Sequence, residues 1–138
     1  MYTYEIDPQA MLTDRFQQFE KFGIPRADIA RVRTATTDMW SDGPGGWVYE
    51  WSKLARSYAD SGDHATAATA YGFAKFPCLN QASRVVAMEH QLEHYEMAAK
   101  DFPVRFDCHK IDIPTAVRPS PCRSTSIRAT AISRRGRC

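Results

Sequence analysis

The side chains most able to do chemistry in this sequence lie at His90, Glu93 and His94, in the order H-x-x-E-H. On a helix, two histidines four residues apart can grip one Zn²⁺ while the glutamate between them acts as a base. On a helical wheel, however, both histidines point about 140° away from the apolar stripe of the same segment, which predicts that they face water. A zinc hydrolase on these three residues is therefore an alternative hypothesis, and we expect no metal here.

Other catalytic and cofactor signatures are missing from the sequence. It has no G-x-S-x-G nucleophile elbow, and residues 43–46 (Gly-Pro-Gly-Gly) lack the ending of a phosphate-binding loop. The four cysteines, at 78, 108, 122 and 138, match no zinc-finger spacing. We expect Cys78 and Cys108 to be reduced structural thiols of a cytoplasmic protein. The sequence thus predicts no catalytic, cofactor-binding or metal-binding residues in this chain.

Helical spacing dominates the first 103 residues. It predicts about five helices, over residues 8–22, 26–40, 47–59, 64–76 and 81–101, separated by glycine- and proline-rich breaks. The fifth helix carries an apolar stripe that we expect to be buried: Val85, Met88, Leu92, Tyr95, Ala99 and Phe102. The fold class is therefore mainly α, a small bundle forming a helical domain over residues 1–103.

An αα-hairpin is predicted inside this bundle. Trp51, Leu54, Ala55 and Tyr58, followed by Tyr71 and Ala74, match much of the tetratricopeptide signature, in which small alanines let two helices approach. Only one such unit is visible, and stacked repeats of this kind need about three. A helical protein-interaction module is therefore a second hypothesis for the function.

After Pro103 the apolar period changes to two, which predicts a strand over residues 104–113. We expect this strand to be an orphan, because nothing after it in the chain reads as a pairing partner. Unpaired strand edges promote association, so self-association through residues 104–113 is the one partner interaction expected of this chain. Residues 104–114 form a second region of the chain in this interpretation.

Composition changes abruptly at residue 115. Residues 115–138 contain six of the 18 Lys/Arg, none of the 16 Asp/Glu and no Phe, Trp or Tyr. We expect this Arg/Ser/Pro tail to be disordered, because it has too little apolar surface to offset the entropy of ordering. It also lacks the aromatic interleaving of a nucleic-acid surface, so no nucleic-acid partner is expected.

No apolar run in the whole sequence is long enough for a membrane span, and the first eight residues do not look like a secretory signal.

Three runs between Trp47 and Ile113 resemble a known group of enzymes: W-V-Y-E-W-S-K-L-A-R-S-Y-A-D-S-G-D, A-Y-G-F-A-K-F-P-C-L and Q-L-E-H-Y-E-M-A-A-K-D-F-P-V-R-F. They are similar to the amino-terminal helical region of α/β-hydrolases related to fermentation-respiration switch esterase-like proteins. The group includes dihydroxypseudooxynicotine hydrolase and hydrolases of polyketide and pigment pathways. The resemblance implies a helical lid over a substrate pocket, with residues 104–113 as the first strand of the hydrolase sheet.

The same resemblance implies a truncated enzyme. The group's serine, aspartate and histidine lie further along the chain, and no residue here corresponds to them. The parent would hydrolyse an ester or an activated C–C bond of a small molecule in polyketide, pigment or antibiotic metabolism, while this chain would have no activity. The tail from about Val117 can be read one base earlier as a string with two strand-like segments, so we interpret it as a shifted reading frame. The competing interpretation is a genuine disordered basic tail.

Overall fold

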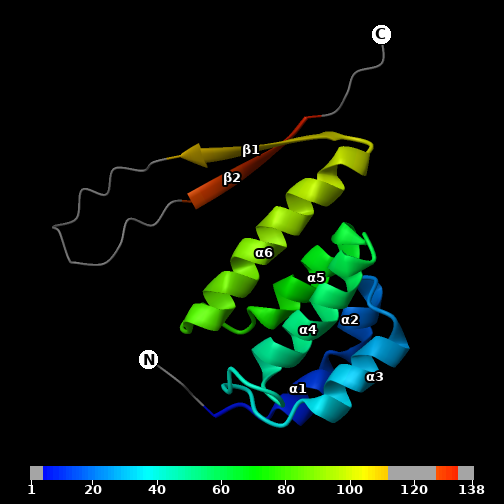
Figure 1. Ribbon diagram of the computed structural model, residues 1–138, viewed down its shortest axis with the longest axis vertical. Helices are drawn as coiled ribbons and strands as arrows, with labels where there is room; N and C mark the ends of the chain where they lie inside the picture. Colours follow the sequence, from blue (N-terminus) through cyan, green and yellow to red (C-terminus); the bar gives the residue numbers. More distant parts are fainter. Residues whose placement is uncertain (1–4, 112–126, 134–138) are drawn as a thin grey trace, which may run out of the picture. The chain divides into compact units, whose positions relative to one another are not determined.

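The computed structural model describes residues 5–111 and 127–133, and within that part the chain is mainly helical, as predicted (Figure 1). The chain divides into two compact units, residues 1–98 and residues 99–138. The elements described are α1 (Pro8–Asp14), α2 (Phe16–Lys21), α3 (Arg26–Ala35), α4 (Trp47–Asp60), α5 (His64–Ala74), α6 (Ala82–Ala98), a 3-10 turn (Ala99–Asp101), β1 (Arg105–Ile111) and β2 (Ile127–Ser133).

The first predicted helix is two helices. The first helix begins at residue 8 as predicted, because the Asp7 carboxylate accepts a hydrogen bond from the Gln9 amide at 2.8 Å and Pro8 follows it. The helix breaks at Arg15, whose φ of −100° and ψ of 6° leave the helical region. Gly23 ends α2 with a φ of +92°, a conformation that favours glycine. The break at Arg15 raises the number of α-helices in the described residues to six, against about five predicted.

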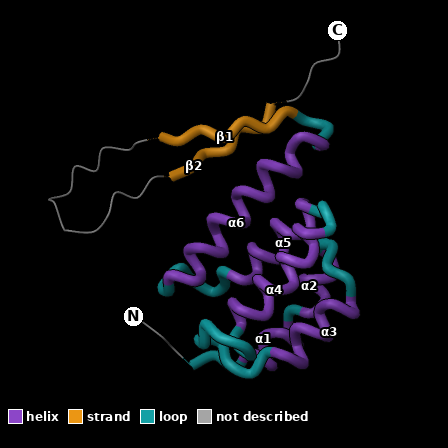
Figure 2. Tube along the Cα trace, viewed as in Figure 1, coloured by secondary structure: helices purple, strands orange, loops and turns teal. Residues whose placement is uncertain are grey.

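The second predicted helix ends five residues early, at Ala35. Residues 36–46 instead fold into a loop, drawn in teal between α3 and α4 (Figure 2). The Thr37 amide donates to the Gly45 carbonyl and the Trp47 amide to the Asp38 carbonyl, each at 2.8 Å. These hydrogen bonds within the loop pair backbone amide and carbonyl groups that a longer helix would pair along its own axis. The helix therefore stops at Ala35.

The predicted αα-hairpin is confirmed by α4 and α5, which lie side by side. Trp47 and Trp51 are almost completely buried on α4, and their rings pack around Phe19 of α2 and Phe73 of α5. The Phe19 and Phe73 ring centroids are 4.7 Å apart with an edge-on geometry. The indole nitrogen of Trp47 also donates to the Phe73 carbonyl at 2.8 Å. This aromatic cluster is the centre of the hydrophobic core.

A polar contact joins α3 to the same hairpin. The Tyr58 hydroxyl donates to the Asp28 carboxylate, which also accepts a hydrogen bond from Arg31. Burial alone would raise the pKa of Asp28, but these two donors outweigh it and the pKa is lowered. Asp28 is therefore held in its charged form at the α3–α4 contact.

The predicted buried face of the long helix is wrong. In α6 the buried residues are Arg84, Ala87 and Ala98, whereas Leu92 is only half-buried and Tyr95 is exposed. The reason lies in α5, which meets α6 with small residues and the ring of Tyr71. A helix approaching Gly72 can place Gln91 directly against it, so the polar face of α6 turns inward.

The second unit corrects the expectation of an orphan strand. β1 pairs antiparallel with β2, with Arg105 opposite Ser133 and Ile111 opposite Ile127. The sequence I-R-A-T-A-I-S of β2 is rich in β-branched residues, a signal that its neighbouring arginines obscured. Residues 127–133 are therefore a strand and not disordered, and β1 has a partner within the chain. The rest of the predicted tail, residues 115–126 and 134–138, lies outside the described residues.

Candidate functional site

A groove of about 410 Å³ lies between α4 and α6, with a side chain of α5 at its wall. This volume is within the range of small-molecule sites in proteins. The lining combines apolar, hydroxyl and charged side chains: Asp42, Val48, Tyr49, Ser52, Lys53, Arg56, Tyr71, Ser83, Val86, Ala87 and His90.

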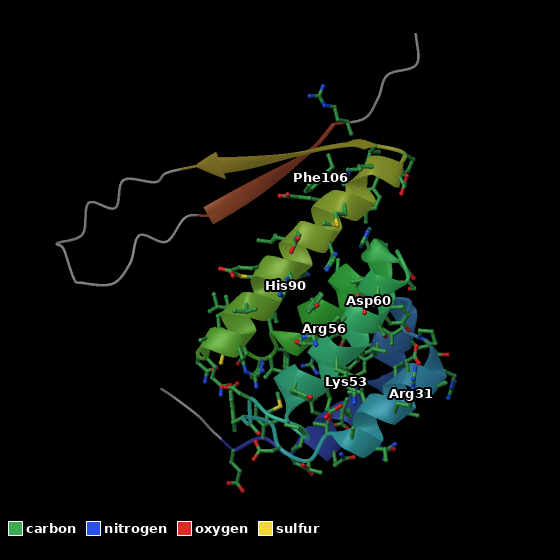
Figure 3. The ribbon with its side chains drawn as sticks, in the orientation of Figure 1. Arg31, Lys53, Arg56, Asp60, His90 and Phe106 are labelled. Carbon is green, nitrogen blue, oxygen red and sulfur yellow. The ribbon has the colours of Figure 1, made fainter. Side chains whose placement is uncertain are left out.

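The helical repeat explains how α4 supplies one wall. Tyr49, Ser52, Lys53 and Arg56 follow the spacing i, i+3, i+4, i+7, so they share one face of the helix. The opposite face carries the buried tryptophans of the core. The core packing of α4 therefore fixes the direction in which Lys53 and Arg56 project, and Figure 3 shows both along this helix.

The other wall comes from α6 by the same spacing. Ser83, Val86, Ala87 and His90 are separated by three, four and seven residues and line the groove together. The Ser83 hydroxyl donates to the carboxylate of Asp42, which belongs to the loop before α4. That hydrogen bond joins the loop to α6 at the groove.

Tyr71 presents its ring and hydroxyl from α5. The residue is only 4% exposed, and the Arg56 guanidinium lies near enough to act on its hydroxyl. Burial raises the pKa of this hydroxyl above its ordinary value, and the positive charge of Arg56 acts in the opposite direction without cancelling the effect. The Tyr71 hydroxyl is therefore protonated near neutral pH.

The helical wheel predicted that His90 and His94 face water. In the structure the His90 side chain is 46% exposed, but both rings contact α5. The His90 ring lies 5.2 Å from the Tyr71 ring, and the His94 ring stacks on Tyr71 at 5.5 Å and on His64 at 5.1 Å. Both histidines therefore contact α5, because the polar face of α6 is the one that packs. Glu93 is exposed and lies 3.3 Å from the Nδ1 of His90.

The rings of His64, His90 and His94 pack against one another and against Tyr71. Burial lowers the pKa of His94, as do the charges of His64 and His90, while Glu93 opposes the shift. Among the described residues no three histidine, cysteine, aspartate or glutamate side chains come together as a metal site. His90 is the one member of the pattern that also lines the groove.

Lys53 and Arg56 are the residues that the sequence analysis did not single out. Their signal was available in the spacing of α4, where two cations occupy the polar face of a helix whose other face holds both tryptophans. Such pairs usually lie on a solvated face. Only the approach of α6 turns that face into a groove, and the approach depends on long-range packing.

The sequence matches no family model and no curated protein. A solved structure named "AbyA5 Wildtype" is similar in fold, with a TM-score of 0.67 at 20% sequence identity over 91% of this chain. The matched part is 32% of that chain, so this protein spans about a third of the length of its structural neighbour. None of the helices in the part of this chain that the structure describes combines the length and apolar character needed to cross a membrane.

Proposed function

We propose that this chain is the helical lid region of an α/β-hydrolase-type enzyme, and that its groove contributes to substrate binding. The observation that carries the proposal is the fold likeness, in which 91% of the chain matches about a third of a longer protein. Such a match is expected of helices that serve as one part of a larger enzyme. The resemblance of residues 47–113 to the helical region of α/β-hydrolases supports the enzyme class.

In this proposal the helices bind and cover the substrate, and the chemistry belongs to the rest of the parent enzyme. An ester or an activated C–C bond would be attacked by a serine activated by a histidine, with backbone amides stabilising the oxyanion. The sequence contains no G-x-S-x-G, so we assign no step of the reaction to its residues. The substrate would be a small molecule of secondary metabolism, as in the enzymes that residues 47–113 resemble.

We further propose that residues from about 117 onward arise from a shifted reading frame. The abrupt loss of acidic and aromatic residues after residue 114 motivates this proposal. Sequencing the coding DNA through this region and beyond is the direct test of both proposals. A hydrolase frame carrying G-x-S-x-G must follow the helices. A gene without such a frame contradicts the lid assignment.

A labelling experiment tests whether the catalytic serine lies outside this chain. We expect a fluorophosphonate probe for activated serines to leave the 138-residue chain unlabelled, because it lacks a nucleophile elbow. The chain joined to its restored downstream frame should be labelled at one serine. Stoichiometric labelling of the 138-residue chain itself would overturn the proposal that it contributes only the lid.

A further inference from the structure

The groove between α4 and α6 has an uneven distribution of charge. Lys53 and Arg56 lie one turn apart on its α4 wall and are both exposed to solvent. Neither forms an ion pair with a carboxylate within the part of the chain that the structure describes. The one acid of the lining, Asp42, accepts a hydrogen bond from Ser83. The α4 wall therefore offers positive charge to whatever enters.

The rest of the groove is suited to a flat apolar body. Tyr49 and Tyr71 contribute aromatic rings, while Val86, which is 47% exposed, contributes an aliphatic surface. Aromatic and aliphatic side chains with a few well-placed polar groups are the usual composition of small-molecule sites. Arg56 and Tyr71 line the groove together, so the guanidinium lies beside this apolar surface.

We propose that this groove binds a small organic acid, with its anionic group at Lys53 and Arg56 and its apolar body against Tyr49, Tyr71 and Val86. The Arg56 guanidinium carries five N–H groups that can donate to an anionic group. Lys53 supplies an ammonium one turn away, so a carboxylate can be held by both. That such a ligand is the parent enzyme's substrate rests on the proposed function. The binding itself does not.

The test uses the whole chain and a matched pair of probes, 2-naphthoate and its neutral amide, 2-naphthamide. The two have the same ring system, so a difference in affinity reports the anionic group. At low ionic strength we expect isothermal titration calorimetry to give roughly tenfold tighter binding for the naphthoate, the size of effect that a charge-assisted hydrogen bond produces. Equal affinity for both probes, or no binding of either, overturns the proposal.

Variants locate the anion site. Lys53→Gln combined with Arg56→Gln should abolish the preference for naphthoate. Lys53→Gln alone should lower it in part, because this variant keeps Arg56 in the groove. The matched control is Lys21→Gln combined with Arg33→Gln, which removes the same charges from exposed positions on α2 and α3 that do not line the groove.

The control variant should keep the full preference for naphthoate. If it loses the preference as the groove variant does, the selectivity reflects net charge, and the proposed site is wrong. This outcome is independent of the gene-sequencing test above. Naphthoate selectivity without a downstream hydrolase frame would support the anion site and contradict the lid assignment. A hydrolase frame without naphthoate selectivity would support the lid assignment and contradict the anion site.

Discussion

The two sides of α5 pack against their neighbours by different chemistry. Toward α4 and α2 the contact is made by tryptophan and phenylalanine rings, with Trp51 fully buried and its ring 5.2 Å from Phe73. Toward α6 the contact is made by histidine rings stacked on Tyr71 and by Gln91 against Gly72. One short helix of alanines thus separates an aromatic interface from a polar one.

This difference predicts where the helical unit is weakest. Three buried polar atoms of the α5–α6 interface have no hydrogen-bond partner among the described residues: His64 Nδ1, His94 Nδ1 and Gln91 Oε1. Each such atom costs about 1–3 kcal/mol relative to its hydrated state. The aromatic side gains free energy from area burial with fewer such costs. We therefore expect α6 to separate from α5 before the α4–α5 hairpin opens.

The largest effect should come from the aromatic side. Trp51→Ala removes a fully buried indole from the centre of the cluster and should lower the free energy of unfolding by about 3–5 kcal/mol. Trp51→Phe is the control. It keeps a ring and removes a buried indole N–H that has no hydrogen-bond partner in the described residues, so its cost should be smaller. Urea unfolding measures both, and equal costs would show that ring packing is not what stabilises this side.

The polar side is fastened at one end by Arg84, which is completely buried. Its guanidinium donates to three backbone carbonyls from two segments: Met39 in the loop before α4, and Ala74 and Phe76 at the end of α5. It also lies over the ring of Trp40, 5.0 Å from the ring centroid. Arg84→Met keeps the length of the side chain and leaves these carbonyls without the donor. The free energy of unfolding should fall by about 2–4 kcal/mol.

The control for this change is Val86→Met, two residues away and 47% exposed, which should alter stability by no more than about 0.5 kcal/mol. Urea unfolding compares the two variants. If Arg84→Met lowers the free energy of unfolding no more than the control does, the hydrogen bonds of Arg84 do not stabilise the fold.

Acid should weaken the polar side selectively. Because the pKa of His94 is lowered in the folded chain, the unfolded chain binds this proton more readily, with its ordinary pKa of 6.5. The stabilisation is complete above that value and is lost as the pH falls from it toward the folded pKa. The side chains facing His94 are His64 and Tyr71 from α5 and His90 and Glu93 from α6.

Melting temperatures measured between about pH 7.5 and about pH 5.5 check this expectation. The native chain should lose thermal stability over this range, and His94→Gln should lose less, because glutamine does not titrate. An unchanged slope in the variant would place the acid-sensitive group elsewhere in the molecule.

The sequence predicted local structure better than contacts between helices. The predicted helix starts at residues 8 and 64 and the predicted stop after residue 22 are all present, because each is set locally, by the capping carboxylates of Asp7 and Asp63 and by the positive φ of Gly23. The inward face of α6 was misjudged because it depends on contacts with α5, including the rings of Tyr71, His90 and His94, which helical spacing within α6 does not reveal. The site followed the same rule. His90 was noticed for a pattern, but Lys53 and Arg56 gained a role only when α6 came to lie opposite them.

The smallest effect is expected at Gly72 of α5, which faces the side chain of Gln91 of α6. A Cβ built on Gly72 would lie 2.8 Å from Nε2 of Gln91 and 3.3 Å from its Cδ, so an alanine there requires a shift. The atoms that must move are the end of a flexible side chain, and its buried Oε1 has no hydrogen bond holding it among the described residues. Alanine also gains about 1 kcal/mol over glycine in a helix interior. Gly72→Ala should therefore change the free energy of unfolding by less than about 1 kcal/mol in either direction.

The double variant separates the two opposing terms. In a Gln91→Ala background the displaced amide is gone, so adding Gly72→Ala should stabilise the chain by up to about 1 kcal/mol through helix propensity alone. Urea unfolding of the four members of this cycle gives the coupling between the positions. A loss above about 2 kcal/mol for Gly72→Ala in both backgrounds would mean that the backbones of α5 and α6 cannot adjust. In that case the polar α5–α6 interface would be as tightly packed as the aromatic interface with α4 and α2. The two sides of α5 would then differ in chemistry but not in rigidity.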